Sequence, residues 1–363
     1  MNMSYDFNDP DVRELLDCFF SLVRTDSPSG EESGMRRKLT AILEPLAGKG
    51  ETDGAGNLKF FIPGMLPGPV RLFSAHMDTV EPGRGIDPQM GSDGVIRSNG
   101  KTVLGADDKD GIAAIICALK RVIGNNVPHA PIELLFSAGE ENNLSGSAKL
   151  APSWLRAKCG WVLDGPGRPG TIYANGVGKI GFIVTIHGKA AHSGICPEKG
   201  VHAFMLAAKA LQMFPPGRNG NATVNYGTIS GGKADNIVPE WVVLTGEIRS
   251  SDPALIEILR KQLEDAWSGI ATIEYGAGYP PYVLRNDGFI ARTKEVLSGM
   301  GLNPEVVDFK AGSDANYLAK AGVDVCLLAM GRADNHTTAE STRPEYIRIM
   351  SEAVFRLMTI PWS

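Results

Sequence analysis

The chain has 363 residues, which is enough for two domains or for one domain with a large insertion. Hydrophobic residues make up 43% of it and charged residues 21%, so it has the material for a globular core. The net charge is −5 and no basic block or stripe exists, which argues against nucleic acids and anionic membranes as partners.

The cysteines and the N-terminal segment bear on the compartment. The five cysteines are scattered and none forms a C-x-x-C pair, which indicates a reducing environment. The segment MNMSYDFNDPDVRELL lacks the basic and apolar regions of a signal peptide. The longest apolar stretches, such as IAAIICAL at 112–119, are too short to span a bilayer. We therefore expect a cytoplasmic protein.

The first half of the chain alternates between helical and extended patterns. Apolar residues at helical spacing predict helices over about 11–24, 35–46 and 108–123. Runs bounded by Gly and Pro predict strands at LKFFI (58–62), VRLFSA (70–75), IELLFSA (132–138) and WVLD (161–164). This alternation predicts an α/β fold with a mostly parallel sheet flanked by helices.

The pattern changes near residue 178 and changes back after Pro281. In between, hairpin-like strands and two helices, at about 200–214 and 253–267, predict a separate α+β domain. The later part predicts helices over 287–300, 314–321 and from about 344, with strands at 304–309 and 323–329. The economical arrangement is one α/β domain, residues 1–178 and 283–363, interrupted by an inserted domain, residues 179–282.

Acidic residues and histidines stand where the predicted strands end. The strands lead in turn to His76 and Asp78, to Glu140 and Glu141, to Asp164 and to His336, while Asp107 and Asp108 precede a helix. Ligands gather outside the carboxyl ends of strands in open α/β sheets. We therefore expect these side chains at one edge of the sheet.

Each of these groups has an ordinary structural alternative. The acidic run at 107–110 could favour the positive end of a helix dipole, and His76 could be a hydrogen-bonded core histidine. Glu140 and Glu141 could be an exposed pair at a helix start. Together, however, the carboxylates repel one another unless positive charge lies among them. No set of lysines or arginines is numerous enough to supply that charge, whereas metal cations would supply it.

The types of ligand narrow the choice of metal. Two histidines with carboxylates and no cysteine suit zinc, cobalt or manganese. One metal needs three or four protein ligands, so this set fits two divalent ions. A carboxylate is the natural bridge between them, and Asp107 lies between the other candidates in sequence. Asp78, two residues after His76, can take the second ring N–H and fix the tautomer of that histidine.

Eight short segments, in order, resemble the M20 family of dinuclear zinc peptidases and amidases. They lie within residues 71–341 and read SAHMDTV, GADDKDG, SAGEENNLSG, VLDG, GKAAHSG, GGKADNIVPE, GSDAN and NHTTAES. HMDTVEPG and GADDKDG are most similar to the peptidase T branch, the cytoplasmic tripeptide aminopeptidases. The resemblance implies release of the N-terminal residue from tripeptides by a metal-bridged hydroxide. It also implies that the inserted domain is a lid and dimerisation domain.

Matched position by position, the resemblance implies five metal ligands. Asp107 would bridge the two metals. His76 and Asp164 would complete one site, and Glu141 and His336 would complete the other. The peptide bond that follows Asp107 would be cis, a conformation that is tolerated outside proline chiefly at functional sites.

Catalytic and substrate contacts are implied in the same way. Glu140 would be the general base, and Asp78 would support the site as described above. His192, in the inserted domain, would reach the substrate carbonyl, either from the same chain or from the partner subunit of a homodimer. Asn236 and Arg249 would line the same cleft, where Arg249 could hold the substrate's terminal carboxylate.

Two further positions complete the comparison. Asp314 and Asn316, in GSDAN, lie in what resembles a substrate-cleft loop, although Ser313 could equally cap a helix there. Sequences like peptidase T usually have a small residue where this chain has Asp110. We expect this charge to be tolerated in the first turn of the helix, past the ligands.

Other functions have weaker support. DGPGRPG contains G-x-G-x-x-G after a strand, but Pro166 and Pro169 stand where a dinucleotide-binding helix would open. G-x-S-x-G is absent, which argues against a serine hydrolase, and H-E-x-x-H is absent as well. A metal-dependent binding protein would have no need of Glu140. Within the enzymes, the alternative is an N-acyl amino acid deacylase, dipeptidase or carboxypeptidase on the same dinuclear site.

Overall fold

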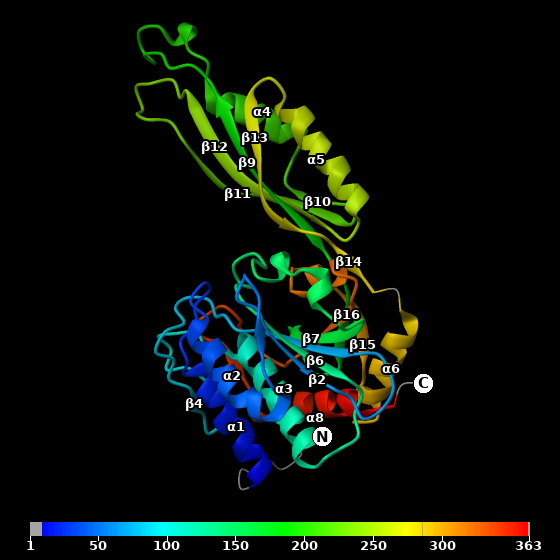
Figure 1. Cartoon of the computed structure of the whole chain (residues 1–363). Helices are drawn as coiled ribbons and strands as arrows, with labels where there is room; N and C mark the ends of the chain where they lie inside the picture. Colours follow the sequence, from blue (N-terminus) through cyan, green and yellow to red (C-terminus); the bar gives the residue numbers. More distant parts are fainter. Residues whose placement is uncertain (1–8, 285, 362–363) are drawn as a thin grey trace. The chain divides into compact units, whose positions relative to one another are not determined.

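The computed structural model describes residues 9–284 and 286–361, which form two compact units (Figure 1). The first unit takes the described residues up to Asn175, those of Val283–Phe309 and those from Ser313 onward. The second unit consists of Gly176–Tyr282 together with Lys310–Gly312. Its bounds lie close to those predicted for the inserted domain, and its role as a lid stays a prediction.

A nine-stranded sheet forms the centre of the first unit. Its strand order is β1 (Glu51–Thr52), β2 (Leu58–Ile62), β6 (Ile132–Ser137), β3 (Arg71–His76), β7 (Cys159–Gly165), β16 (Asp324–Ala329), β8 (Thr171–Gly176) and β14 (Tyr282–Val283), with β15 (Glu305–Phe309) beside β8. The four central strands β6, β3, β7 and β16 are parallel. β2 and β8 flank them in antiparallel fashion. The predicted mostly parallel sheet is confirmed.

Helices cover this sheet, which explains why its central strands are buried along almost their whole length. Every residue of β3 and β6 is buried, as in strands with both faces covered. The helices are α1 (Pro10–Val23), α2 (Ser33–Ala47), α3 (Ala106–Gly124), α6 (Asp287–Ser298), α7 (Ala315–Lys320) and α8 (Pro344–Thr359). α3 packs on β3 and β7, and α1 and α8 pack on α3.

Local sequence signals set the start of α1, and aromatic stacking stabilises the core. The carboxylate of Asp9 accepts the N–H of Asp11 at 3.0 Å, and Pro10 occupies the first turn, where its missing N–H is not needed. Trp161 of β7 stacks between Phe73 and Phe289, with ring centroids 5.1 and 5.0 Å apart. These contacts join the first half of the chain to α6.

Several short elements of the first unit have no sequence signature. β4 (Gln89–Met90), β5 (Ile96–Arg97) and β17 (Ser341–Thr342) form a small separate sheet. Short 3-10 turns cover Ser147–Lys149 and Pro152–Trp154, and a third in the second unit covers Pro197–Lys199. Two-residue strands contain too few residues for an alternating pattern, so sequence periodicity does not reveal them.

The second unit is an antiparallel sheet with two helices. Its strand order is β10 (Gly217–Asn219), β11 (Ala222–Gly231), β12 (Trp241–Ser250), β9 (Gly178–His187) and β13 (Ala271–Tyr279). α4 (Ala203–Met213) and α5 (Pro253–Trp267) pack on β9 and β12 and on each other. Phe182 and Trp267 lie in the core between sheet and helices. None of the helices in the described part of the chain is long and apolar enough to cross a membrane.

Candidate metal centre

The parallel strands bring the candidate residues to one edge of the sheet. His76 ends β3 and is in register with Ser137, which ends β6 just before Glu140 and Glu141. β7 lies on the other side of β3 and carries Asp164. β16 lies next to β7 and leads to the segment that contains His336, while the start of α3 supplies Asp107.

Three groups of these side chains have the spacing of metal ligands. Among the described residues, the ligand atoms of each group lie within 4.8 Å of one another: His76 with Asp107 and Glu141, His76 with Glu140 and Asp164, and Asp107 with Asp108 and Asp164. The donors are imidazole nitrogens and carboxylate oxygens, without a thiolate. This donor set fits zinc, cobalt or manganese.

The two oxygens of Asp107 face different histidines. Oδ1 lies 3.2 Å from Nε2 of His76, and Oδ2 lies 3.3 Å from Nε2 of His336. On the first side, Nε2 of His76 is 3.8 Å from Oδ1 of Asp164. On the second side, Nε2 of His336 is 2.9 Å from Oε1 of Glu141. Asp107 thus has one oxygen toward each histidine, an arrangement compatible with a carboxylate that bridges two ions, with two further candidate ligands on each side.

Asp78 orients the ring of His76 through Nδ1, the ring nitrogen that does not face Asp107. The imidazole is 2% exposed, and its Nδ1 lies 3.1 Å from the backbone oxygen of Asp78 and 3.4 Å from Oδ1. An N–H on Nδ1 therefore points at Asp78 and leaves the lone pair of Nε2 toward Asp107. The contact expected from the two-residue spacing is present.

Asp78 also holds the segment that carries the two glutamates. Its Oδ1 accepts the backbone N–H of Glu140 at 2.9 Å, and its Oδ2 accepts that of Glu141 at 3.1 Å. The hydroxyl of Ser29 donates to Oδ2 at 2.7 Å. Burial opposes ionisation of Asp78, but His76 and these donors lower its pKa.

The side chains of the two glutamates have different neighbours. Both glutamates lie within ligand spacing of His76, but Glu141 also pairs with His336, whereas Glu140 is grouped with Asp164. Burial, followed by repulsion from Asp164, raises the pKa of Glu140 well above its ordinary value. Adjacent residues therefore occupy different environments, as separate roles for them require.

One arginine that the sequence reasoning did not single out lies among the carboxylates, although the described part of the chain has no set of basic residues there numerous enough to balance them. Arg332 is buried, and its Nη1 contacts Oδ1 of Asp107 and lies 3.2 Å from Oδ1 of Asp164. Its Nη2 contacts Asp108 and donates to the backbone oxygen of Leu163 at 2.9 Å. Burial opposes ionisation of Asp107, but Arg332, followed by His336 and His76, lowers its pKa well below the usual range.

Asp110 is the counterpart of this arginine. Nε of Arg332 donates to Oδ1 of Asp110 at 2.9 Å, and the side chain of Asp110 has no exposed surface. Burial raises the pKa of Asp110 to about 6, although Arg332 acts in the opposite direction. The position that departs from the family pattern therefore takes part in the site's charge network. The Asp107–Asp108 peptide is cis, as the resemblance implied.

Glu340 is a second residue that the sequence reasoning missed. Its two oxygens accept the backbone N–H groups of Gly105 at 2.7 Å and Asp107 at 2.9 Å, so it holds the start of α3. Burial, followed by repulsion from Asp107, raises the pKa of Glu340 to about 7. Its place in NHTTAES, four residues after His336, is the signal that could have pointed to it.

Within the second unit, the predicted substrate residues fall into two places. His192 is bridged to Ile237, next to Asn236, and both His192 and Asn236 are exposed. Arg249 lies near the far end of β12, where it donates to Glu247 at 2.7 Å. The ten residues of β12 alone span about 30 Å. His192 and Arg249 of one chain therefore lie far apart, and a cleft shared by these residues, with His192 from either subunit, stays a prediction.

Asp314 and Asn316 are buried at the start of α7. The hydroxyl of Ser137, at the end of β6, donates to Oδ2 of Asp314. Oδ1 of Asn316 accepts the N–H of Ser313 at 2.9 Å, and the hydroxyl of Ser313 accepts the N–H of Ala315 at 3.2 Å. These contacts match the alternative of a helix start capped by Ser313, and a substrate role for Asp314 and Asn316 stays a prediction.

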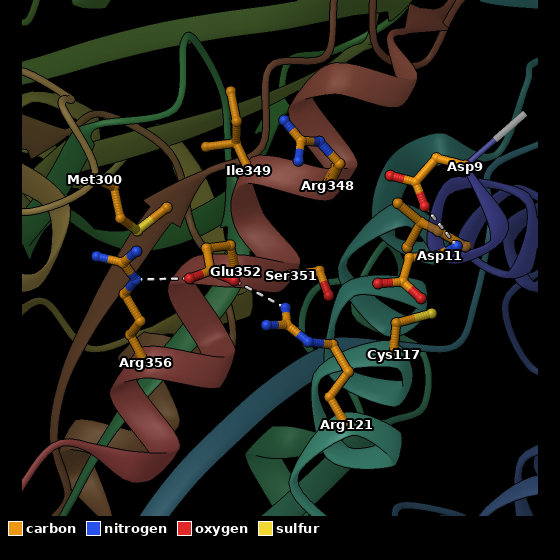
Figure 2. A pocket seen from close by; sticks show the side chains of 11 residues that line it. Asp9, Asp11, Cys117, Arg121, Met300, Arg348, Ile349, Ser351, Glu352 and Arg356 are labelled. Carbon is orange, nitrogen blue, oxygen red and sulfur yellow. Dashed lines mark hydrogen bonds and ion pairs between the residues drawn. The ribbon is translucent and has the colours of Figure 1, made fainter. Parts of the chain in front are cut away.

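A surface pocket of about 390 Å³ lies apart from this centre, between α1, α3 and α8 (Figure 2). Glu352 crosses it and accepts from Arg121 at 2.8 Å and from Arg356 at 2.7 Å. Three of its charged groups are thus paired with one another, and it contains none of the residues predicted for metal binding. The groups with the spacing of metal ligands lie at the sheet edge instead.

Comparison with known proteins gives one consistent family. The model of Peptidase family M20/M25/M40 matches residues 72–359. The uncharacterized protein YqjE of Bacillus subtilis is 32% identical, over 95% of this chain and 98% of its own length. Peptidase T of Exiguobacterium sp. is 25% identical, over 67% of this chain and 61% of its own length.

Solved structures agree with this result. Aminopeptidase PepT from Bacillus cereus has a TM-score of 0.90 and 33% identity, with 96% of this chain and 98% of that one covered. A tripeptidase from Staphylococcus aureus has a TM-score of 0.93 and 29% identity, with the same coverage. A dinuclear metal binding peptidase of the M20 family from Bacillus subtilis, at 17% identity and a TM-score of 0.71, covering 96% of this chain and 99% of that one, shares the fold.

Proposed function

Since the chain belongs to peptidase family M20/M25/M40, we propose that it is a metal-dependent aminopeptidase that releases the N-terminal residue from tripeptides. The observation that carries the proposal is the pair of histidines on the two oxygens of Asp107, with Glu140 beside them. The similarity to an aminopeptidase and a tripeptidase over nearly the whole chain supports the substrate class.

Two divalent ions, zinc in the first place, are the proposed cofactors. His76, Asp107 and Asp164 would hold one, and Asp107, Glu141 and His336 the other. We refer to these as the His76 position and the His336 position. When bound, such ions lower the pKa of water and polarise a substrate carbonyl.

The protein's own part in the chemistry is proton transfer by Glu140. Its carboxylate would accept the proton that water loses as the water oxygen attacks the peptide carbonyl. It would then donate that proton to the amine nitrogen that leaves as the C–N bond breaks. Its buried position favours the protonated form between the two steps. Asp78 would position Glu140 through the backbone N–H.

A homodimer would reconcile the predicted substrate residues with their separation. His192 and Arg249 lie at opposite ends of the sheet in the second unit of one chain. If both contact one substrate, one of them comes from a second copy. Arg249 would then hold the substrate carboxylate, and His192 would stabilise the charge that develops on the carbonyl oxygen.

A substrate panel tests the proposal. The protein is stripped of metal, reconstituted with zinc, cobalt or manganese, and given tri-alanine, di-alanine and N-acetyl-alanine. We expect the highest kcat/KM on tri-alanine, with free alanine and di-alanine as products. A clear preference for N-acetyl-alanine or for di-alanine would instead assign a deacylase or a dipeptidase to the same site. Sedimentation of the active form tests the dimer.

A further inference from the structure

Arg332 touches only one side of the proposed dinuclear centre. Its Nη1 contacts Oδ1 of Asp107 and lies 3.2 Å from Oδ1 of Asp164. These are the same two oxygens that Nε2 of His76 faces, at 3.2 and 3.8 Å. On the other side, Oδ2 of Asp107 accepts a hydrogen bond from Nδ2 of Asn335 at 2.8 Å and faces the ring of His336. The guanidinium therefore adds its charge to the His76 position.

Each nitrogen atom of the Arg332 side chain has at least one oxygen partner within the protein. Nε donates to Asp110, Nη1 to the two oxygens named above, and Nη2 contacts Asp108 and the backbone oxygen of Leu163. Both Arg332 and Asp110 are buried, and their charged atoms face partners within the protein. A buried guanidinium with all its donors engaged is a fixed charge, not a surface side chain that swings away.

We propose that Arg332 makes the two metal positions unequal. The guanidinium weakens metal binding at the His76 position, where it contacts two ligand oxygens, much more than at the His336 position, with which it shares only Asp107. A fixed positive charge in contact with two ligand oxygens repels a divalent ion and competes for the same lone pairs. The enzyme then holds one ion tightly and exchanges the other, so that its activity follows the concentration of free divalent ions. This inference rests on the proposed metal centre.

The test is calorimetric titration of the stripped protein with Co²⁺, with the Co²⁺ absorption spectrum as a second readout. The double variant Arg332→Gln/Asp110→Asn removes both charges and keeps polar side chains of similar size, so Asp110 is not left buried and unpaired. We expect wild type to bind two ions with distinct affinities. In the double variant, the weaker affinity should rise tenfold or more and the tighter should change less than twofold.

Controls separate the charge effect from damage to the fold. Arg97→Gln/Asp93→Asn removes an exposed ion pair and should leave both affinities unchanged. Arg332→Met/Asp110→Ala is the second version of the change, should the first fail to fold, and circular dichroism monitors the fold of each. In a Glu141→Ala background, which disables the His336 position, removal of the Arg332 charge should still tighten the remaining site. In an Asp164→Asn background, which disables the His76 position, removal of the Arg332 charge should not tighten the remaining site.

The outcomes are distinguishable. The inference is overturned if the double variant binds Co²⁺ with the same two affinities as wild type. It is also overturned if the double variant binds Co²⁺ more tightly at the His336 position and not at the His76 position. Loss of metal from the double variant would mean that Arg332 orders the ligands, which also overturns it. These three results leave the peptidase proposal standing if the stripped wild type binds two ions and regains activity. A wild type that binds no Co²⁺ overturns both.

Discussion

The carboxylate of Asp78 accepts the backbone N–H of Glu140 at 2.9 Å, and its other oxygen accepts that of the next residue. The same carboxylate lies behind His76. One side chain therefore sets both the orientation of a proposed metal ligand and the path of the segment that carries the proposed base. Asp78, two residues after His76, therefore positions both parts of the candidate site.

Asp78→Asn tests this positioning. The amide keeps one acceptor oxygen but loses the charge that orients the ring of His76, so we expect metal affinity to fall about 10–100-fold. Asp53→Asn is the matched control, because Asp53 also accepts two backbone N–H groups, in a loop outside the site. Titration with Co²⁺ measures both. Equal affinities in Asp78→Asn and wild type would contradict the role.

The two adjacent glutamates should respond differently to the same change. Glu140→Gln removes the proposed proton acceptor, so turnover should fall by at least about 100-fold while metal content stays unchanged. Glu141→Gln removes the partner of His336 and should lower metal content first. Metal analysis and tripeptide hydrolysis are measured on the same samples. Equal metal loss in the two variants would contradict the division of roles.

Removal of metal should abolish hydrolysis. The carboxylates gathered at the sheet edge need a cation to activate water, so dialysis against a chelator should stop tripeptide cleavage. Addition of zinc, cobalt or manganese should restore it. Activity that survives dialysis, with metal analysis showing less than one ion per chain, would rule out the metal mechanism.

Glu340→Ala should destabilise the protein without removal of a ligand. The change leaves the buried N–H groups of Gly105 and Asp107 without their acceptor, which costs about 1–3 kcal/mol. The midpoint of thermal unfolding should therefore fall. Glu198→Ala, at an exposed position of the second unit, serves as the control. An unchanged midpoint of unfolding would contradict this role of Glu340, because it would mean that water satisfies the two N–H groups equally well.

Glu352 provides a pH test outside the metal centre. Burial opposes its ionisation, but Arg356, followed by Arg121, lowers its pKa below 4.5. Its ionised form thus contributes stability that is present above pH 4.5 and lost as the pH falls through the folded-state value. Glu352→Gln should therefore lose about 0.5–1 kcal/mol at neutral pH, and the difference from wild type should disappear in acid. A difference that persists in acid would contradict this origin.

Long elements with a strong pattern were predictable from the sequence. The helix from Pro253 to Trp267 and the strand Leu58–Ile62 have the predicted bounds, because apolar residues mark each element and Pro or Gly marks its ends. The clustering of the predicted ligands was predictable as well, because parallel strands end at the same edge of a sheet.

The residues that escaped prediction are those whose role depends on a single contact across the fold. Arg332 is one arginine in AMGRADNH, and only the pairing of β16 with β7 brings it to the carboxylates. Asp110 could not be read as its partner without that pairing. The distance between His192 and Arg249 follows from the register of β9 with β12, which the hydrophobic pattern does not specify.

The position of β16 in the sheet has a consequence for synthesis on the ribosome. β16 lies between β7 and β8, although it is made long after both, and it is followed by Arg332, His336 and Glu340. A nascent chain that stops before this strand has an unpaired edge at β7 and uncompensated acids around Asp107. A chain truncated there is thus expected to aggregate through the exposed edge of β7 and to lack His336, so the complete candidate metal centre forms only after β16 and the segment that follows it have been made.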